Sequence, residues 1–129
     1  MKKILVVDDE KPISDIVKFN LTKEGYEVFT AYDGEEALEK VKEVEPDLIL
    51  LDLMLPKLDG LEVAREVRKT YDMPIIMVTA KDQSSDFLEG YSHGADYYIS
   101  KPYTTMQIQY GIKIVTGQPN IWSTKRGRF

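Results

Sequence analysis

Five short runs of apolar residues recur along the chain, and each has a length suited to one β-strand. They span residues 4–7, 27–31, 48–51, 75–79 and 97–100. The first, third and fourth runs are almost continuously aliphatic, a pattern typical of strands that are buried on both faces of a parallel sheet. These runs therefore predict a sheet whose central strands are covered on both sides.

After each of these runs, apolar residues recur at helical spacing. They stand three or four positions apart, which indicates one amphipathic helix after every strand. The residues concerned are Ile13, Ile16, Val17 and Leu21; Ala37, Leu38, Val41 and Val44; Leu61, Val63, Ala64 and Val67; Phe87, Leu88 and Tyr91; and Ile108, Ile112 and Val115. Strand and helix thus alternate five times. This order predicts an α/β fold of the (βα)5 type, a three-layer sandwich with a parallel sheet between two layers of helices.

The length of 129 residues suits a single domain. We predict that residues 1–117 form this domain and that residues 118–129, which lose the periodicity and turn basic, form an irregular tail. The chain is 43% hydrophobic and 30% charged and has no apolar run long enough to cross a bilayer. Acidic residues follow its first apolar run, where a signal peptide would carry small residues for cleavage. We therefore expect a cytoplasmic protein without membrane contact.

Two features of the composition exclude classes of chemistry. Without cysteine, the mechanism cannot use a disulfide, a thiolate metal site or a thiol nucleophile. A net charge of −5 disfavours direct nucleic-acid binding by the domain, because phosphate contacts need clustered lysine and arginine. The basic tail around Trp122 could bind nucleic acid or an acidic partner, although such short tails are usually disordered. His93 has no histidine or cysteine partner for a metal and is interpreted as structural.

Acidic, hydroxyl and basic side chains stand at the carboxyl ends of the predicted strands. Asp8 and Asp9 follow the first strand and Asp52 follows the third, whereas Thr79 ends the fourth and Lys101 follows the fifth. Because these strand ends meet at one edge of a parallel sheet, we expect the side chains to converge there. Clustered carboxylates raise one another's pKa and destabilise the fold unless a cation joins them. The sequence therefore predicts a cation site.

Magnesium suits this site, because it takes oxygen ligands and usually borrows only one or two carboxylates. We expect Asp9 and Asp52 to bind Mg²⁺ directly and Asp8 to act through a water molecule. The backbone carbonyl near Met54, just past the third strand, could complete the ligand shell.

A carboxylate beside magnesium and a lysine is also a candidate nucleophile toward phosphorus, and Asp52 is the best placed one. Lys101 and the metal would neutralise the phosphoryl oxygens, since this transfer needs mainly positioning and charge compensation. Thr79 could donate a hydrogen bond to the phosphate. If Thr79 moved in this way, the ring of Tyr98 could fill the space behind it, which would make a two-state switch.

Four motifs carry a family resemblance. They are VVDDE after the first strand, LLDLMLPKLDG after the third, VTA after the fourth and ISKPY after the fifth. In this order, over Lys2 to about Thr105, they resemble the receiver domain of bacterial response regulators. The first eighty residues are most similar to receivers of the winged-helix transcription factor subfamily. The resemblance implies a flavodoxin-like fold with the strand order 2-1-3-4-5.

The resemblance also implies a role for each motif residue. The acidic pair is Asp8 and Asp9, the phosphoacceptor is Asp52, the switch residues are Thr79 and Tyr98, and the phosphate-binding lysine is Lys101, with a cis peptide before Pro102. A sensor histidine kinase would be the phosphoryl donor. The receiver would catalyse its own phosphorylation and a slow autodephosphorylation, and would not be an enzyme with an external substrate. Phosphorylation would change the surface of the fourth helix, fifth strand and fifth helix, and so control an output domain or protein partner.

The last third of the chain is atypical for that subfamily. Subfamily receivers dimerise through charged residues on the fourth helix, fifth strand and fifth helix, and here only Asp96 is clearly present. Lys113 is the single charged residue of the predicted fifth helix. A homodimer through this surface is therefore not favoured. Because nothing here has the length of a winged helix, we expect the output to come from another module or a partner.

Simpler roles exist for the same residues. The acidic residues could merely cap turns or helices, Thr79 and Tyr98 could be ordinary strand residues, and Lys101 could be a surface lysine. A flavin carrier of the same topology is disfavoured, because the acids of the first loop would repel a flavin phosphate. A phosphohydrolase usually has a second aspartate two residues after the nucleophile, where this chain has Met54. A receiver-like module that binds partners without phosphorylation stays the alternative hypothesis.

Overall fold

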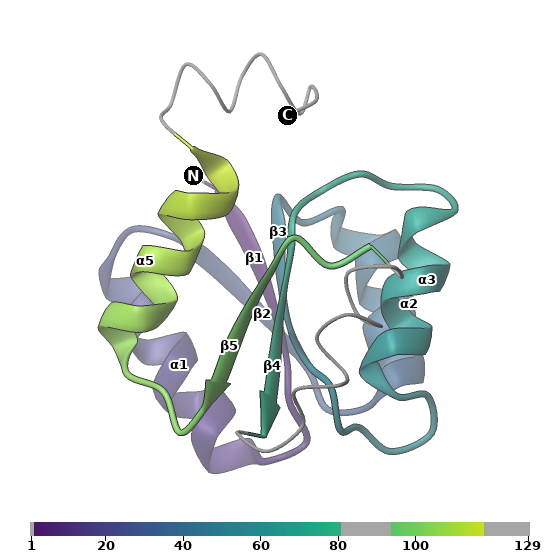
Figure 1. Cartoon of the computed structure of the whole chain (residues 1–129), viewed down its shortest axis with the longest axis horizontal. Helices are drawn as coiled ribbons and strands as arrows, with labels where there is room; N and C mark the ends of the chain where they lie inside the picture. Colours follow the sequence, from purple (N-terminus) through teal and green to yellow (C-terminus); the bar gives the residue numbers. More distant parts are fainter. Residues whose placement is uncertain (1, 81–93, 118–129) are drawn as a thin grey trace.

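The structure is a computed structural model, which describes residues 2–80 and 94–117 (Figure 1). In chain order its elements are β1 (Lys3–Val7), α1 (Lys11–Lys23), β2 (Glu27–Ala31), α2 (Gly34–Val44), β3 (Leu48–Asp52), α3 (Gly60–Arg68), β4 (Ile75–Ala80), β5 (Tyr97–Lys101) and α5 (Thr105–Thr116). The predicted fourth helix around residues 87–91, His93 and the predicted tail at 118–129 lie outside the described residues. None of the helices in the described part of the chain is both long and apolar enough to cross a membrane.

The five strands form one parallel sheet in the order β2-β1-β3-β4-β5, which confirms the predicted order. In this register Val7 of β1 pairs with Leu51 of β3, and Asp52 pairs with Val78 of β4. Asp52 and Lys101 are the last residues of β3 and β5, whereas the apolar pattern placed them just after these strands. The backbone pairing of β3 and β5 therefore extends into the polar residues at their carboxyl ends.

Two layers of helices cover the sheet, with α1 and α5 on one face and α2 and α3 on the other (Figure 1). Alternate residues of a strand point to opposite faces. Thus Leu5 of β1 packs with α2 and α3, whereas its neighbour Ile4 packs with α1 and α5. Both residues are at most 1% exposed. The sheet is therefore buried on both sides, as the aliphatic runs predicted.

The loop after β3 is held close to the sheet by the start of α3. Asp59 and Glu62 form a capping box, in which the Asp59 carboxylate accepts from the Glu62 N–H at 2.9 Å and the Glu62 carboxylate accepts from the Asp59 N–H at 3.2 Å. The N–H of Gly60 donates to the Leu53 carbonyl at 2.8 Å. A Cβ atom on Gly60 would lie 2.5 Å from the backbone oxygen of Asp52. Only glycine therefore lets α3 begin this close to Asp52.

Arg68, at the end of α3, binds the segment that leads into β5. Its guanidinium donates to the carbonyls of Gly94 at 3.0 Å and Met73 at 2.7 Å, and to the Asp96 carboxylate at 2.7 Å. The same carboxylate oxygen accepts from the N–H of Ile75 at 2.9 Å. Asp96, which the sequence suggested only as a remnant of a dimer surface, therefore binds within its own chain and fixes the start of β4 and β5.

Replacing Arg68 with methionine is expected to lower the free energy of unfolding by about 1–3 kcal/mol, because the carbonyls and the Asp96 carboxylate lose their shared donor. Urea unfolding followed by circular dichroism measures this. Arg65→Met is the matched control, since Arg65 lies exposed in the same helix, and it should cost less than about 0.5 kcal/mol. Equal midpoints for the two variants would contradict the role of Arg68.

Candidate functional site

Three carboxylates meet at the carboxyl edge of the sheet. Asp8 and Asp9 follow β1, and Asp52 ends β3 beside it. One carboxylate oxygen of each lies within 4.8 Å of those of the other two. Asp8 and Asp52 are 4% and 3% exposed, whereas Asp9 faces solvent. The convergence predicted from the strand ends is therefore present in the structure.

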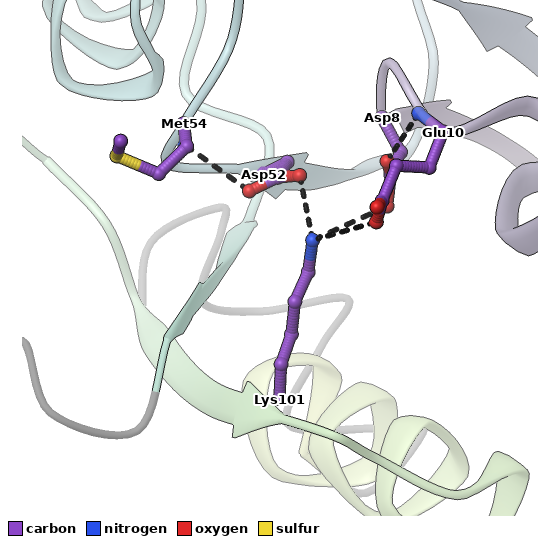
Figure 2. Close-up of polar contacts among 5 residues, drawn as sticks. All are labelled: Asp8, Glu10, Asp52, Met54 and Lys101. Atoms are coloured by element: carbon purple, nitrogen blue, oxygen red, sulfur yellow. Dashed lines mark hydrogen bonds and ion pairs between the residues drawn. The ribbon is translucent and has the colours of Figure 1, made fainter.

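Lys101 projects from the end of β5 into this group of acids (Figure 2). Its ammonium lies 2.9 Å from Oδ2 of Asp52 and 3.8 Å from Oδ2 of Asp8. The lysine side chain is 26% exposed, so the contact with Asp52 is largely shielded from water. A buried carboxylate is costly unless it is paired and hydrogen-bonded, and Lys101 supplies the charge for this pairing.

Each buried carboxylate is oriented by the backbone just after it. Oδ1 of Asp8 accepts from the N–H of Glu10 at 2.8 Å, and Oδ1 of Asp52 accepts from the N–H of Met54 at 3.1 Å. These are side-chain bonds to the backbone two residues on, the geometry of an Asx turn. The acids thus do cap turns, but each uses only one oxygen for this purpose. The second oxygen, Oδ2, is left to face Lys101.

The acids keep a surplus of negative charge despite the lysine. Burial, together with the charge of Asp52, raises the pKa of Asp8 from 3.8 to about 6. Burial also raises the pKa of Asp52, although the hydrogen bond and charge of Lys101 oppose this shift. Burial lowers the pKa of Lys101, but the hydrogen bond and charge of Asp52 outweigh burial and raise it overall. One ammonium does not neutralise the site, and three oxygen donors this close fit a hard divalent cation.

Thr79 and Tyr98 lie on the neighbouring strands. Thr79 of β4 is fully buried and follows Val78, the residue that pairs with Asp52, so it stands at the same edge of the sheet. Tyr98 of β5 pairs with Met77 and is half-buried against the core on the α2 and α3 face. The structure therefore places Thr79 at the same edge of the sheet as the acids and Tyr98 on the adjacent strand, while their switch roles stay predictions.

The segment after Lys101 turns toward α1. The peptide bond between Lys101 and Pro102 is cis. A groove of about 470 Å³ lies between this segment and α1. It is lined by Lys101, Pro102, Tyr103 and Ile108 on one side and by Ile13 and neighbouring residues of α1 on the other. Burial and the nearby charge of Asp8 raise the pKa of Tyr103 to about 12, so its hydroxyl stays protonated at neutral pH.

Glu10 is a member of the site that sequence reasoning missed. Its carboxylate lies 3.5 Å from the Lys101 ammonium, across 91 positions of sequence (Figure 2). A signal was present, because Glu10 directly follows the acidic pair and precedes the first predicted helix. The contact itself depends on where β5 ends, which local sequence does not reveal.

Comparison with known proteins agrees with this geometry. The family model of the response regulator receiver domain matches residues 4–113. The Francisella response regulator 1452 receiver domain is 31% identical, with a TM-score of 0.84 over 92% of this chain and 99% of that one. A CheY-like receiver domain protein from Methanospirillum hungatei JF-1 is 35% identical, with a TM-score of 0.83 over 88% of this chain and 92% of that one. NtrX from Brucella abortus is 30% identical, with a TM-score of 0.86 over 93% of this chain and 28% of that longer one.

The raised pKa of Asp8 makes the stability of the metal-free protein depend on pH. Between pH 3.8 and about pH 6, the folded protein binds more protons at Asp8 than the unfolded chain does. The free energy of unfolding therefore falls as the pH rises through this range. Thermal unfolding in EDTA should show about 1 kcal/mol less stability at pH 7.5 than at pH 5 from this carboxyl. Asp8→Asn should remove most of that difference.

Magnesium should change this pH dependence. Because the cation competes with protons for the carboxylates, Mg²⁺ is expected to raise the melting temperature more at pH 7.5 than at pH 5. An equal increase at both pH values, or none, would contradict a metal site formed by these carboxylates.

Proposed function

Because this chain belongs to the response regulator receiver domain family, we propose that it is a phosphorylation switch in which Asp52 accepts a phosphoryl group. Three features of its environment support Asp52 above the other acids. It is 3% exposed, its Oδ1 is held by the backbone of Met54, and its Oδ2 lies 2.9 Å from the Lys101 ammonium. This carboxylate is therefore oriented and paired with a cation before any donor arrives.

The proposed reaction transfers a phosphoryl group from a phosphohistidine of a sensor histidine kinase. A carboxylate oxygen of Asp52 bonds to phosphorus, the phosphorus–nitrogen bond breaks, and its electron pair stays on the imidazole nitrogen. Lys101 pairs with a phosphoryl oxygen as charge develops there. Mg²⁺ held by Asp8, Asp9, Asp52 and the carbonyl of Met54 would neutralise the remaining charge on the transferring group.

In the phosphorylated state, the hydroxyl of Thr79 would donate to a phosphoryl oxygen, and Tyr98 would fill the space behind it. The burial of Thr79 at the same edge of the sheet supports this step, as does the place of Tyr98 on the next strand. The resulting change at β5 and α5, together with the predicted fourth helix, would control an output domain or protein partner in the cytoplasm.

The phosphoryl group should leave Asp52 slowly. The residue two positions after Asp52 is Met54, which is 60% exposed and has no acid or base to activate water. We therefore propose that the domain works as a signalling switch with slow autodephosphorylation rather than as a phosphohydrolase.

Intact mass spectrometry after incubation with phosphoramidate tests the proposal. The wild-type protein should gain one phosphate when Mg²⁺ is present and none in EDTA. Asp52→Asn should gain none, whereas Asp15→Asn, a matched change at an exposed position of α1, should behave as wild type. If the wild-type protein gained no phosphate with Mg²⁺, the alternative of an unphosphorylated interaction module would replace this proposal.

A further inference from the structure

Glu10 is the N-cap residue, directly before α1, but its side chain does not cap that helix. Its backbone carbonyl accepts from the N–H groups of Ile13 and Ser14, both at 3.0 Å, while its carboxylate makes no capping bond. The N–H of Glu10 is also engaged, by Oδ1 of Asp8 at 2.8 Å. The backbone of Glu10 is therefore fixed on both sides, and its carboxylate is directed to the site instead of to the helix.

The carboxylate of Glu10 meets Lys101 from the solvent side. The ammonium lies 2.9 Å from Asp52, 3.5 Å from Glu10 and 3.8 Å from Asp8, so one cation is shared among three acids. The side chain of Glu10 is 55% exposed, whereas those of Asp8 and Asp52 are 6% and 3% exposed. Glu10 is also outside the group of acids whose oxygens lie within metal-binding distance of one another. Glu10 therefore contacts Lys101 without belonging to the predicted metal site.

We propose that Glu10 is a positioning residue that holds the Lys101 ammonium at the mouth of the site and competes with the phosphoryl group for it. This inference rests on the proposed function of Asp52. A phosphoryl group on Asp52 needs the same ammonium, so Lys101 must give up part of its contact with Glu10 during the transfer. Glu10 thereby lowers the rate at which Asp52 is phosphorylated.

The expected size of this effect on the rate follows from the exposure of the ion pair between Glu10 and Lys101. Pairs between exposed charges are worth about 0.2–1 kcal/mol, which corresponds to a change of about 1.4- to fivefold in rate. Removing the charge of Glu10 should therefore accelerate phosphorylation by that factor. The acceleration should shrink as salt is raised, because the screening length falls to about 3 Å at 1 M salt, which is shorter than the 3.5 Å between Glu10 and Lys101.

The experiment compares initial rates of phosphorylation by acetyl phosphate, measured by intact mass with saturating Mg²⁺ at low and high salt. The variants are wild type, Glu10→Gln and Glu66→Gln. Glu66 is the matched control, because it is an exposed glutamate on α3 that pairs with Lys69 at 2.9 Å, outside the site. Circular dichroism and thermal unfolding should show the same fold for all three proteins.

A second comparison tests whether Glu10 acts through Lys101. Glu10→Gln is repeated in a Lys101→Met background, where there is no ammonium for Glu10 to hold. A restraint that acts through Lys101 disappears there, so Lys101→Met and the double variant should react at the same slow rate. A readout of this kind would not respond to a merely structural role of Glu10.

The expected result is a faster Glu10→Gln, an unchanged Glu66→Gln, and no effect of Glu10→Gln without Lys101. Equal rates for Glu10→Gln and wild type would overturn the inference, and so would an acceleration that persists in the Lys101→Met background. Both outcomes leave the proposed function intact, because that function fails only if the wild-type protein forms no Mg²⁺-dependent adduct.

Discussion

The ion pair between Lys101 and Asp52 joins the ends of two strands that do not pair with each other. β4 lies between β3 and β5, so the 2.9 Å contact exists only because all strands are parallel and end at the same edge. Buried charge of this kind is costly when its partner is lost, which makes the edge sensitive to the position of β5. The Arg68–Asp96 pair, at the opposite end of β5, contributes by fixing where that strand begins.

The same edge shows a conflict between stability and chemistry. Burial raises the pKa of Asp8 and Asp52, which means that the folded chain holds these acids at a cost in stability near neutral pH. Such shifts are typical of functional sites, where charge is gathered for a ligand rather than for the fold. In this protein the cost is limited by one lysine and by two backbone N–H groups, those of Glu10 and Met54. A bound divalent cation would supply the positive charge that Lys101 alone does not.

Much of the fold could be predicted because its signal is local. Aliphatic runs mark the buried strands, helical spacing marks the amphipathic helices, and the strand order follows the family that the motifs resemble. The strand ends were less accurate, since backbone pairing continues into polar residues such as Asp52 and Lys101 that an apolar pattern excludes. The convergence of the acids with Lys101 was nevertheless predicted, because it requires only that parallel strands end at one edge.

What the sequence could not show depends on contacts between distant positions. Glu10 meets Lys101 across 91 residues, and Arg68 meets Asp96 across 28, and neither pair has a local pattern. The switch roles of Thr79 and Tyr98 involve a second state, and kinship with the winged-helix subfamily stays a prediction. The most direct test of the account is to trap the phosphorylated protein with borohydride, which reduces an acyl phosphate to an alcohol, and to locate the change by peptide mass spectrometry. The account predicts reduction at Asp52 alone, and reduction at Asp8, Asp9 or another acid would contradict it.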